Sequence, residues 1–186
     1  MFSRPIDDHL ALRLVTPLDA EEAYAIVERN RAHLERFMPW VDQTRSVEDE
    51  RAGMALWAGF DPDRTISCWL TLDGAIIGSV GLPRIDRPAR WAEIGYWIGS
   101  AHEGRGYVTA AVRELERLCF GELGLERVQI RADVDNTRSR AIPERLGYTL
   151  EGVLRRAGLS GHGQITDHAM YSLLKPEWIA RQAGGV

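Results

Sequence analysis

The feature that most restricts the fold of this chain is a strand, a glycine-containing turn and a helix in direct succession. Residues 91–99 (WAEIGYWIG) have strand-like composition, and apolar residues recur at helical spacing over 107–123. Residues 103–106 (EGRG) form the turn between them. A glycine turn that enters a helix leaves backbone N–H groups unpaired at the positive end of the helix dipole. The segment therefore predicts an anion-binding site, with a plain tight turn as the alternative.

The remaining periodicities predict a mixed α/β domain. Two strand-like runs, 66–72 and 75–82, flank Asp73-Gly74, a dipeptide typical of hairpin turns. The expected strands cover 10–16, 66–72, 75–82, 91–99, 127–134, 148–154 and 165–174. The expected helices cover 17–29, 31–37, 47–57, 107–123 and 138–146, with a helical turn at 176–178. Hairpins followed by strand–helix–strand units indicate a mixed sheet of about seven strands flanked by helices.

Composition favours a single globular domain over residues 1–186. The chain is 45% hydrophobic and 27% charged, and no apolar run reaches the roughly 18 residues that a membrane helix needs. The N-terminus lacks the pattern of a signal peptide, so we expect a cytoplasmic protein without a membrane partner. A formal net charge of −4 argues against direct nucleic-acid binding. The histidines and the two cysteines lack metal-ligand spacing, so no metal is expected.

A second informative segment, 136–148 (NTRSRAIPERLGY), follows a predicted strand directly. Asn136 and Ser139 stand at a strand-to-helix junction, where such side chains either cap the helix or bind a ligand. Arg138 and Arg140 are candidates for phosphate contact, or exposed surface residues.

Five blocks together resemble the GNAT acetyltransferases, most closely the RimJ/RimL-like branch that acetylates the N-termini of ribosomal proteins. Four of them occur in the order and at the spacing of that family. The N-terminal block, 30–42, resembles the substrate-side helices of that branch, so the resemblance spans nearly the whole chain. The blocks are NRAHLERFMPWVD (30–42), AEIGYWIG (92–99), EGRGYVTAAV (103–112), NTRSRAIPERLGYTLEGVLR (136–155) and DHAMYSLLKPEW (167–178).

The resemblance implies a twisted, mostly antiparallel sheet that splays between its fourth and fifth strands. Acetyl-CoA would lie in that opening as the co-substrate, without a metal. The cofactor-binding residues implied are Trp97, Ile98, Arg105, Gly106, Tyr107, Val108, Thr109, Asn136 and Arg140. Glu103 is a departure, because the family usually has a neutral or basic residue there; a backbone cradle for phosphate would survive it.

The resemblance also implies roles in catalysis. Acetyl transfer needs a neutral amine, an oxyanion donor and a proton for the leaving thiolate. Glu93 would act as the base, usually through water, although a strand-face acid in a salt bridge is the alternative. Ser139 would protonate or hydrogen-bond the sulfur, since Pro143 stands where many relatives have a tyrosine. The backbone N–H near Ile98 would stabilise the oxyanion.

Trp40, Tyr96 and Asp167 are the implied acceptor-side residues. The expected acceptor is a primary amine, foremost the α-amine of a ribosomal-type protein. Neutralising an α-amine at pH 7 costs about 1 kcal/mol, against nearly 5 kcal/mol for a lysine, so a weakly placed base suffices more easily. A small amine, such as an antibiotic or an aminoacyl conjugate, and a non-catalytic acyl-CoA-binding module remain alternatives. The sequence leaves open a monomer or a homodimer.

Overall fold

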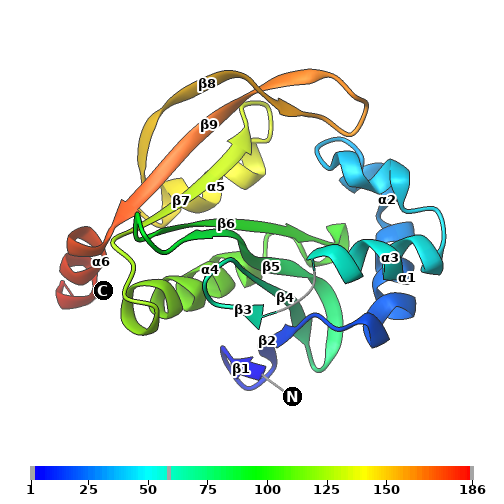
Figure 1. Ribbon diagram of the computed structural model, residues 1–186, viewed down its shortest axis with the longest axis horizontal. Helices are drawn as coiled ribbons and strands as arrows, with labels where there is room; N and C mark the ends of the chain where they lie inside the picture. Colours follow the sequence, from blue (N-terminus) through cyan, green and yellow to red (C-terminus); the bar gives the residue numbers. More distant parts are fainter. Residues whose placement is uncertain (1–2, 58–59, 185–186) are drawn as a thin grey trace.

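The computed structural model describes residues 3–57 and 60–184, which form one twisted nine-stranded sheet with helices on both faces (Figure 1). The strand order is β1-β2-β4-β5-β6-β7-β9-β8, and β3 pairs with β4 beside this path. The strands are β1 (Ser3–Pro5), β2 (Leu10–Leu14), β3 (Phe60–Asp61), β4 (Thr65–Leu72), β5 (Ala75–Asp86), β6 (Trp91–Ile98), β7 (Arg127–Asp133), β8 (Thr149–Leu159) and β9 (Ile165–Leu174). The α-helices are α1 (Ala20–Arg29), α2 (Arg31–Leu34), α3 (Val47–Trp57), α4 (Tyr107–Arg117), α5 (Thr137–Arg145) and α6 (Lys175–Ala183).

All seven predicted strands are present, and the two additional ones are the short strands β1 and β3. The predicted helix over 31–37 is shorter, because α2 ends at Leu34. The predicted helix over 107–123 consists of α4 and a π-helical turn, Leu118–Glu122. None of the described helices is long and apolar enough to cross a bilayer.

The predicted splay is confirmed and lies between β6 and β7. These strands pair in parallel over three residues only, Trp91–Glu93 of β6 with Arg127–Gln129 of β7. The other strand pairs are antiparallel. Beyond Glu93 and Gln129 the two strands separate, and the sheet divides into two arms (Figure 1).

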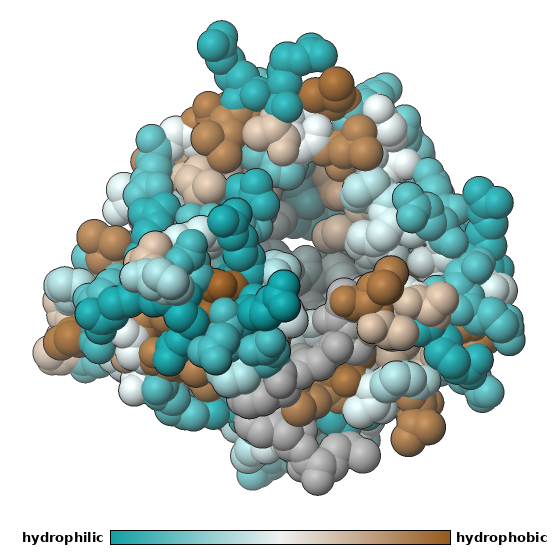
Figure 2. Space-filling model, viewed as in Figure 1, coloured by the Kyte–Doolittle hydropathy of each residue, from teal (hydrophilic) through white to brown (hydrophobic). Residues whose placement is uncertain are grey.

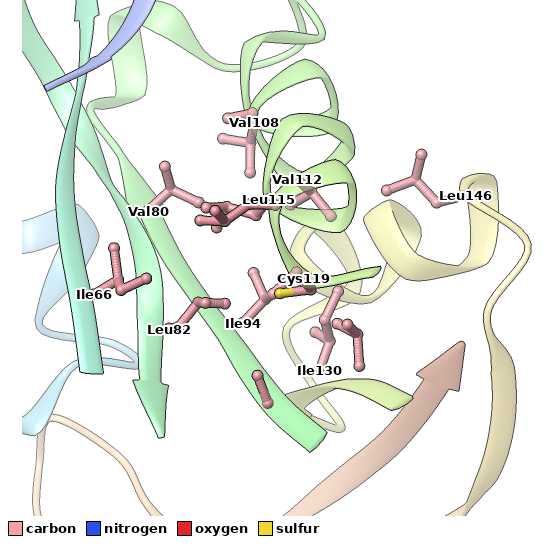
Figure 3. Packing of buried hydrophobic residues seen from close by; sticks show 14 of the residues in the cluster. Ile66, Val80, Leu82, Ile94, Val108, Val112, Leu115, Cys119, Ile130 and Leu146 are labelled. Carbon is pink, nitrogen blue, oxygen red and sulfur yellow. The ribbon is translucent and has the colours of Figure 1, made fainter. Parts of the chain in front are cut away.

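The main core lies between the sheet and α4. Val108, Val112 and Leu115 repeat at helical spacing and pack against Val80 and Ile94 of the sheet (Figure 3). On the other face of the N-terminal arm, α1 and α3 cover a second cluster around the fully buried Trp69. This two-sided packing fixes β6, the strand that borders the opening.

The two cysteines are free and buried, as expected for small apolar side chains. Burial raises the pKa of the Cys68 thiol to about 12 and raises that of Cys119 as well. Both thiols therefore stay protonated and unreactive at neutral pH.

Gly78 of β5 lies directly behind the part of β6 that borders the opening. A Cβ atom on Gly78 would stand 2.3 Å from the Trp97 carbonyl oxygen, a backbone atom that cannot move without displacing β6. We expect Gly78→Ala to lower the free energy of unfolding by about 1–3 kcal/mol in urea denaturation. Gly95→Ala is the matched control on β6, since its Cβ would meet Pro83 at an ordinary 3.5 Å. Equal effects of the two substitutions would contradict this packing.

Glu50 of α3 gives a second stability prediction. Its side chain is buried, and no hydrogen bond or ion pair reaches its carboxylate from the described residues, so burial raises its pKa to about 6 from an ordinary 4.5. The folded state therefore binds the proton more tightly, and stability falls as pH rises from about 4.5 through 6. We expect Glu50→Gln to stabilise the protein by about 1–2 kcal/mol at pH 7 and to have little effect near pH 4.

Urea denaturation at both pH values measures this difference, and Glu48→Gln on the exposed side of the same helix is the control. A Glu50→Gln effect that does not change with pH would contradict the explanation by burial.

Candidate functional site

The opening between β6 and β7 leads into a cavity of about 1180 Å³. Its wall includes residues 96–98 of β6, residues 102–110 of the turn and α4, and residues 135–139 at the start of α5. The segment 33–38, from α2 onward, completes the wall on the other side. Figure 2 shows the molecule hollowed at its centre, between the two arms.

The backbone of β6 offers free hydrogen-bonding groups to this opening. The Gly99 N–H donates to the Ile77 carbonyl of β5 at 2.9 Å. Because successive residues of a strand direct their N–H groups to opposite sides, the Ile98 N–H faces away from β5 and toward the opening. None of the described strands pairs with this side of β6 there, since pairing with β7 has ended at Glu93. The position suits a hydrogen bond to a bound ligand.

The predicted glycine turn and helix start form one wall of the cavity. Gly104 and Gly106 have φ values of 72° and 81°, in the left-handed region that favours glycine. Gly106 is the N-cap of α4 and provides no side-chain cap. Within the described residues, the N–H groups of residues 107–109 have no hydrogen-bond acceptor. These free donors and the positive end of the helix dipole suit an anion, which is the kind of ligand that the sequence predicts here.

Charge in the cavity wall also favours an anion. Among the described residues, five arginines and two carboxylates line it, and the excess of positive charge attracts anionic groups. The arginines are Arg36, Arg105, Arg113, Arg138 and Arg145, and the carboxylates are Glu103 and Asp135.

Asn136, Ser139 and Tyr96 lie together in the cavity wall. The Asn136 side chain caps α5 by accepting from the Ser139 N–H at 3.1 Å. The Tyr96 hydroxyl donates to the Ser139 carbonyl oxygen at 2.9 Å, and the Ser139 Oγ donates to the Tyr96 hydroxyl at 3.3 Å. Burial raises the pKa of Tyr96, so it keeps its proton, which is committed to the carbonyl. The Ser139 hydroxyl is thus the more readily redirected donor.

Glu93 lies apart from the residues that line the cavity. It stands at the last position of β6 that pairs with β7, and both its carboxylate oxygens accept hydrogen bonds. Oε1 accepts from Arg131 at 3.0 Å and Oε2 accepts from Gln129 at 3.1 Å, both on β7. This is the salt-bridge arrangement named as the alternative, and it also holds β6 to β7 where the arms diverge.

Arg140 also lies outside the cavity wall. Its guanidinium donates to the Tyr171 hydroxyl at 3.0 Å and to the Val134 carbonyl oxygen at 2.8 Å. These bonds join α5 to β9 and to the end of β7.

The other two predicted acceptor-side residues do not reach the cavity wall either. Trp40 packs on Trp97, with ring centroids 6.1 Å apart. Asp167 accepts a hydrogen bond from the Arg156 N–H at 2.7 Å within the β8–β9 hairpin. Of these three residues, Tyr96 alone lines the cavity. Trp40 packs behind Trp97, which does line it.

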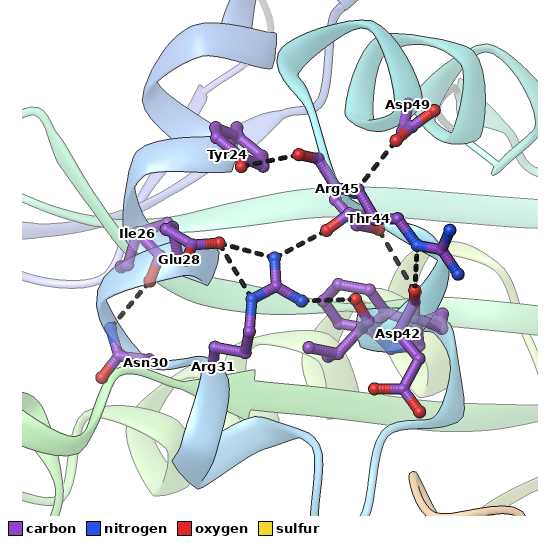
Figure 4. Close-up of polar contacts among 11 residues, drawn as sticks. Tyr24, Ile26, Glu28, Asn30, Arg31, Asp42, Thr44, Arg45 and Asp49 are labelled. Atoms are coloured by element: carbon purple, nitrogen blue, oxygen red, sulfur yellow. Dashed lines mark hydrogen bonds and ion pairs between the residues drawn. The ribbon is translucent and has the colours of Figure 1, made fainter.

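The segment that carries Trp40 is held by Arg31 of α2 (Figure 4). Its guanidinium donates to the carbonyl oxygens of Val41 at 2.7 Å and Thr44 at 2.6 Å, and it pairs with Glu28. These bonds close the chain after α2 into a compact loop beside the cavity.

Sequence reasoning singled out only Trp40 in this region, yet the cavity is lined by the residues before it. They are His33, Leu34, Arg36, Phe37 and Met38. The block NRAHLERFMPWVD carries the signal, since the whole block resembles the substrate-side helices of the family. Helical periodicity over so short a helix could not say which of its residues face inward.

Comparison with known proteins agrees with this architecture. The acetyltransferase (GNAT) domain family matches residues 9–149. YdaF of Bacillus subtilis (strain 168), provisionally assigned as a ribosomal N-acetyltransferase, is 38% identical over 96% of this chain and 98% of its own length. The ribosomal-protein-serine acetyltransferase of Escherichia coli (strain K12) is 26% identical over 82% of this chain and 86% of its own.

A solved structure shares the fold at moderate identity. The Microcin C7 self immunity acetyltransferase MccE, in complex with acetyl-CoA and AMP, superposes with a TM-score of 0.84 at 29% identity, covering 91% of this chain and 94% of its own. The family match spans most of the chain, and the splayed sheet and helix α4 are those expected of the fold. The chain belongs to the GNAT family of acetyltransferases.

Proposed function

We propose that this N-acetyltransferase transfers the acetyl group of acetyl-CoA to the α-amine of a protein N-terminus, of the ribosomal type. The observation that carries the proposal is the cavity at the β6–β7 opening, where free backbone donors of β6 and of the α4 N-terminus face the same space. On this proposal residues 1–186 act as one catalytic domain in the cytoplasm.

The cavity wall fits acetyl-CoA by charge and by shape. The N–H groups of residues 107–109 and the arginines suit a pyrophosphate and a further phosphate. The edge of β6 at residues 96–98 suits an extended, amide-containing arm that adds to the sheet. MccE, a relative by fold and sequence, is a complex with acetyl-CoA, which supports this assignment.

Bound acetyl-CoA supplies a thioester as the acyl donor, and the chain supplies the donors around it. The Ile98 N–H would stabilise negative charge that develops on the thioester oxygen. The Ser139 hydroxyl would turn from Tyr96 to the leaving sulfur, which takes the proton that the amine loses on forming the amide bond. Glu93 would accept the ammonium proton through water, since it does not line the cavity.

The proposed acceptor rests on the names of two relatives and on the contacts of Glu93. YdaF and the Escherichia coli relative are named for ribosomal substrates, and both cover most of this chain. Glu93 is tied to Arg131 and Gln129, and an acceptor that is easily deprotonated suits such a base better than lysine does.

Acceptor preference is tested by thiol release from acetyl-CoA with Ser- and Ala-starting peptides, lysine peptides with blocked N-termini, and small amines. We expect release with the free N-terminal peptides and at least about tenfold less with lysine peptides, because lysine costs more to neutralise. N-acetylated copies of the same peptides are the control. Release with small amines alone would retain the enzyme and overturn the protein substrate.

The role assignments are tested by Ser139→Ala and Glu93→Gln. We expect each to lower kcat about tenfold or more, because each removes a proton-transfer group, with the Kd for CoA changed less than threefold. Thr149→Ala, which removes an exposed hydroxyl outside the cavity wall, is the control for Ser139. Normal turnover by either variant would contradict the role given to that residue.

A further inference from the structure

Glu103 is the residue of the glycine turn that departs from the family pattern, and its side chain does not point at the helix N-terminus beside it. The carboxylate reaches two other elements. Its Oε2 pairs with Arg138 of α5, and its Oε1 lies 3.3 Å from Nε2 of His33 on α2. All three side chains line the cavity, and they come from three different segments of its wall.

The position of the carboxylate explains how an acid is tolerated beside a phosphate site. Gly106 caps α4 without a side chain, and the N–H groups of residues 107–109 remain free, so Glu103 does not occupy the backbone cradle. Instead the Glu103 carboxylate forms an ion pair with the Arg138 guanidinium. The Arg138 side chain is 74% exposed and the Glu103 side chain 21%, so the pair lies at the mouth of the cavity.

We propose that Glu103 couples the two ligand sites: it competes with the phosphates of CoA for Arg138 and holds the acceptor-side helix α2 through His33. The inference rests on the proposed function for its acceptor arm, while its cofactor arm needs CoA binding alone. Without CoA, the carboxylate is the anion that Arg138 pairs with. When a phosphate takes Arg138, Glu103 keeps its contact with His33.

The charges give the sign of each effect. A carboxylate near an incoming phosphate repels it and occupies a guanidinium that would otherwise bind it, so Glu103 weakens CoA binding. The His33 contact ties α2, a helix of only four residues, to the turn before α4. Loss of the contact loosens the acceptor wall while leaving the phosphate cradle intact.

The test is titration calorimetry of CoA binding to the Glu103→Gln variant, which places a neutral residue at this position. We expect the Kd for CoA to fall about two- to fivefold. Arg138→Gln should raise the Kd for CoA about tenfold, because the substitution removes the guanidinium that would contact a phosphate. In the Arg138→Gln background, Glu103→Gln should give less than half of its effect in the wild-type background, because the effect acts through Arg138.

Asp135→Asn is the matched control, since it removes the same charge from the cavity wall without touching Arg138. Its effect on the Kd for CoA should be smaller than that of Glu103→Gln. An equal effect, or weaker CoA binding by Glu103→Gln, would overturn the cofactor arm. If the wild type binds no CoA, the proposed function fails instead, so the two failures are distinguishable.

Acceptor kinetics test the second arm. Glu103→Gln should raise the acceptor KM about threefold or more while it tightens CoA, and His33→Gln should raise the acceptor KM with the Kd for CoA unchanged. Thermal melting of each variant checks folding. An acceptor KM unchanged in both variants would overturn the coupling to α2.

Discussion

The site depends on where pairing between β6 and β7 stops. Three residue pairs, Trp91–Glu93 with Arg127–Gln129, hold the strands together, and beyond them the backbone of β6 has free N–H and C=O groups on one side. Buried backbone groups must find partners, so an unpaired strand edge inside a fold is a site for a ligand that can supply them. This edge is surrounded by α4, which packs against β6, by the capped start of α5 and by the closed loop after α2.

Features set by local chemistry were predictable from the sequence. The Asp73-Gly74 hairpin joins β4 to β5, and both turn residues have positive φ values, 50° and 86°, as a two-residue turn between twisted strands requires. The glycine turn before α4 and the capping of α5 by Asn136 are likewise short-range features. The splay itself came from the family resemblance, since no local pattern marks the end of pairing between strands about 35 residues apart.

Side-chain partnerships between distant elements were not predictable. Arg140 follows Ser139 directly, yet it turns to Tyr171 on β9, while Arg138 turns to the cavity. The pairing of Glu93 with Arg131 joins residues 38 positions apart in the sequence. Such contacts depend on strand register and on the opening angle of the sheet. Neither can be derived from the composition of a segment.

The two arms of the sheet are joined at more than the three-residue seam. The Tyr96 hydroxyl donates to the start of α5, Glu103 pairs with Arg138, and Arg145 donates to the Thr109 hydroxyl. Hydrogen bonds and an ion pair therefore span the gap beyond the paired residues of β6 and β7. A seam with cross-links further out behaves mechanically as a braced frame, whereas a seam alone behaves as a hinge. A ligand that binds Arg138 breaks its ion pair with Glu103 but leaves the hydrogen bond from Tyr96 to Ser139. The separation of the two arms is then kept, while the entrance of the cavity loses this cross-link.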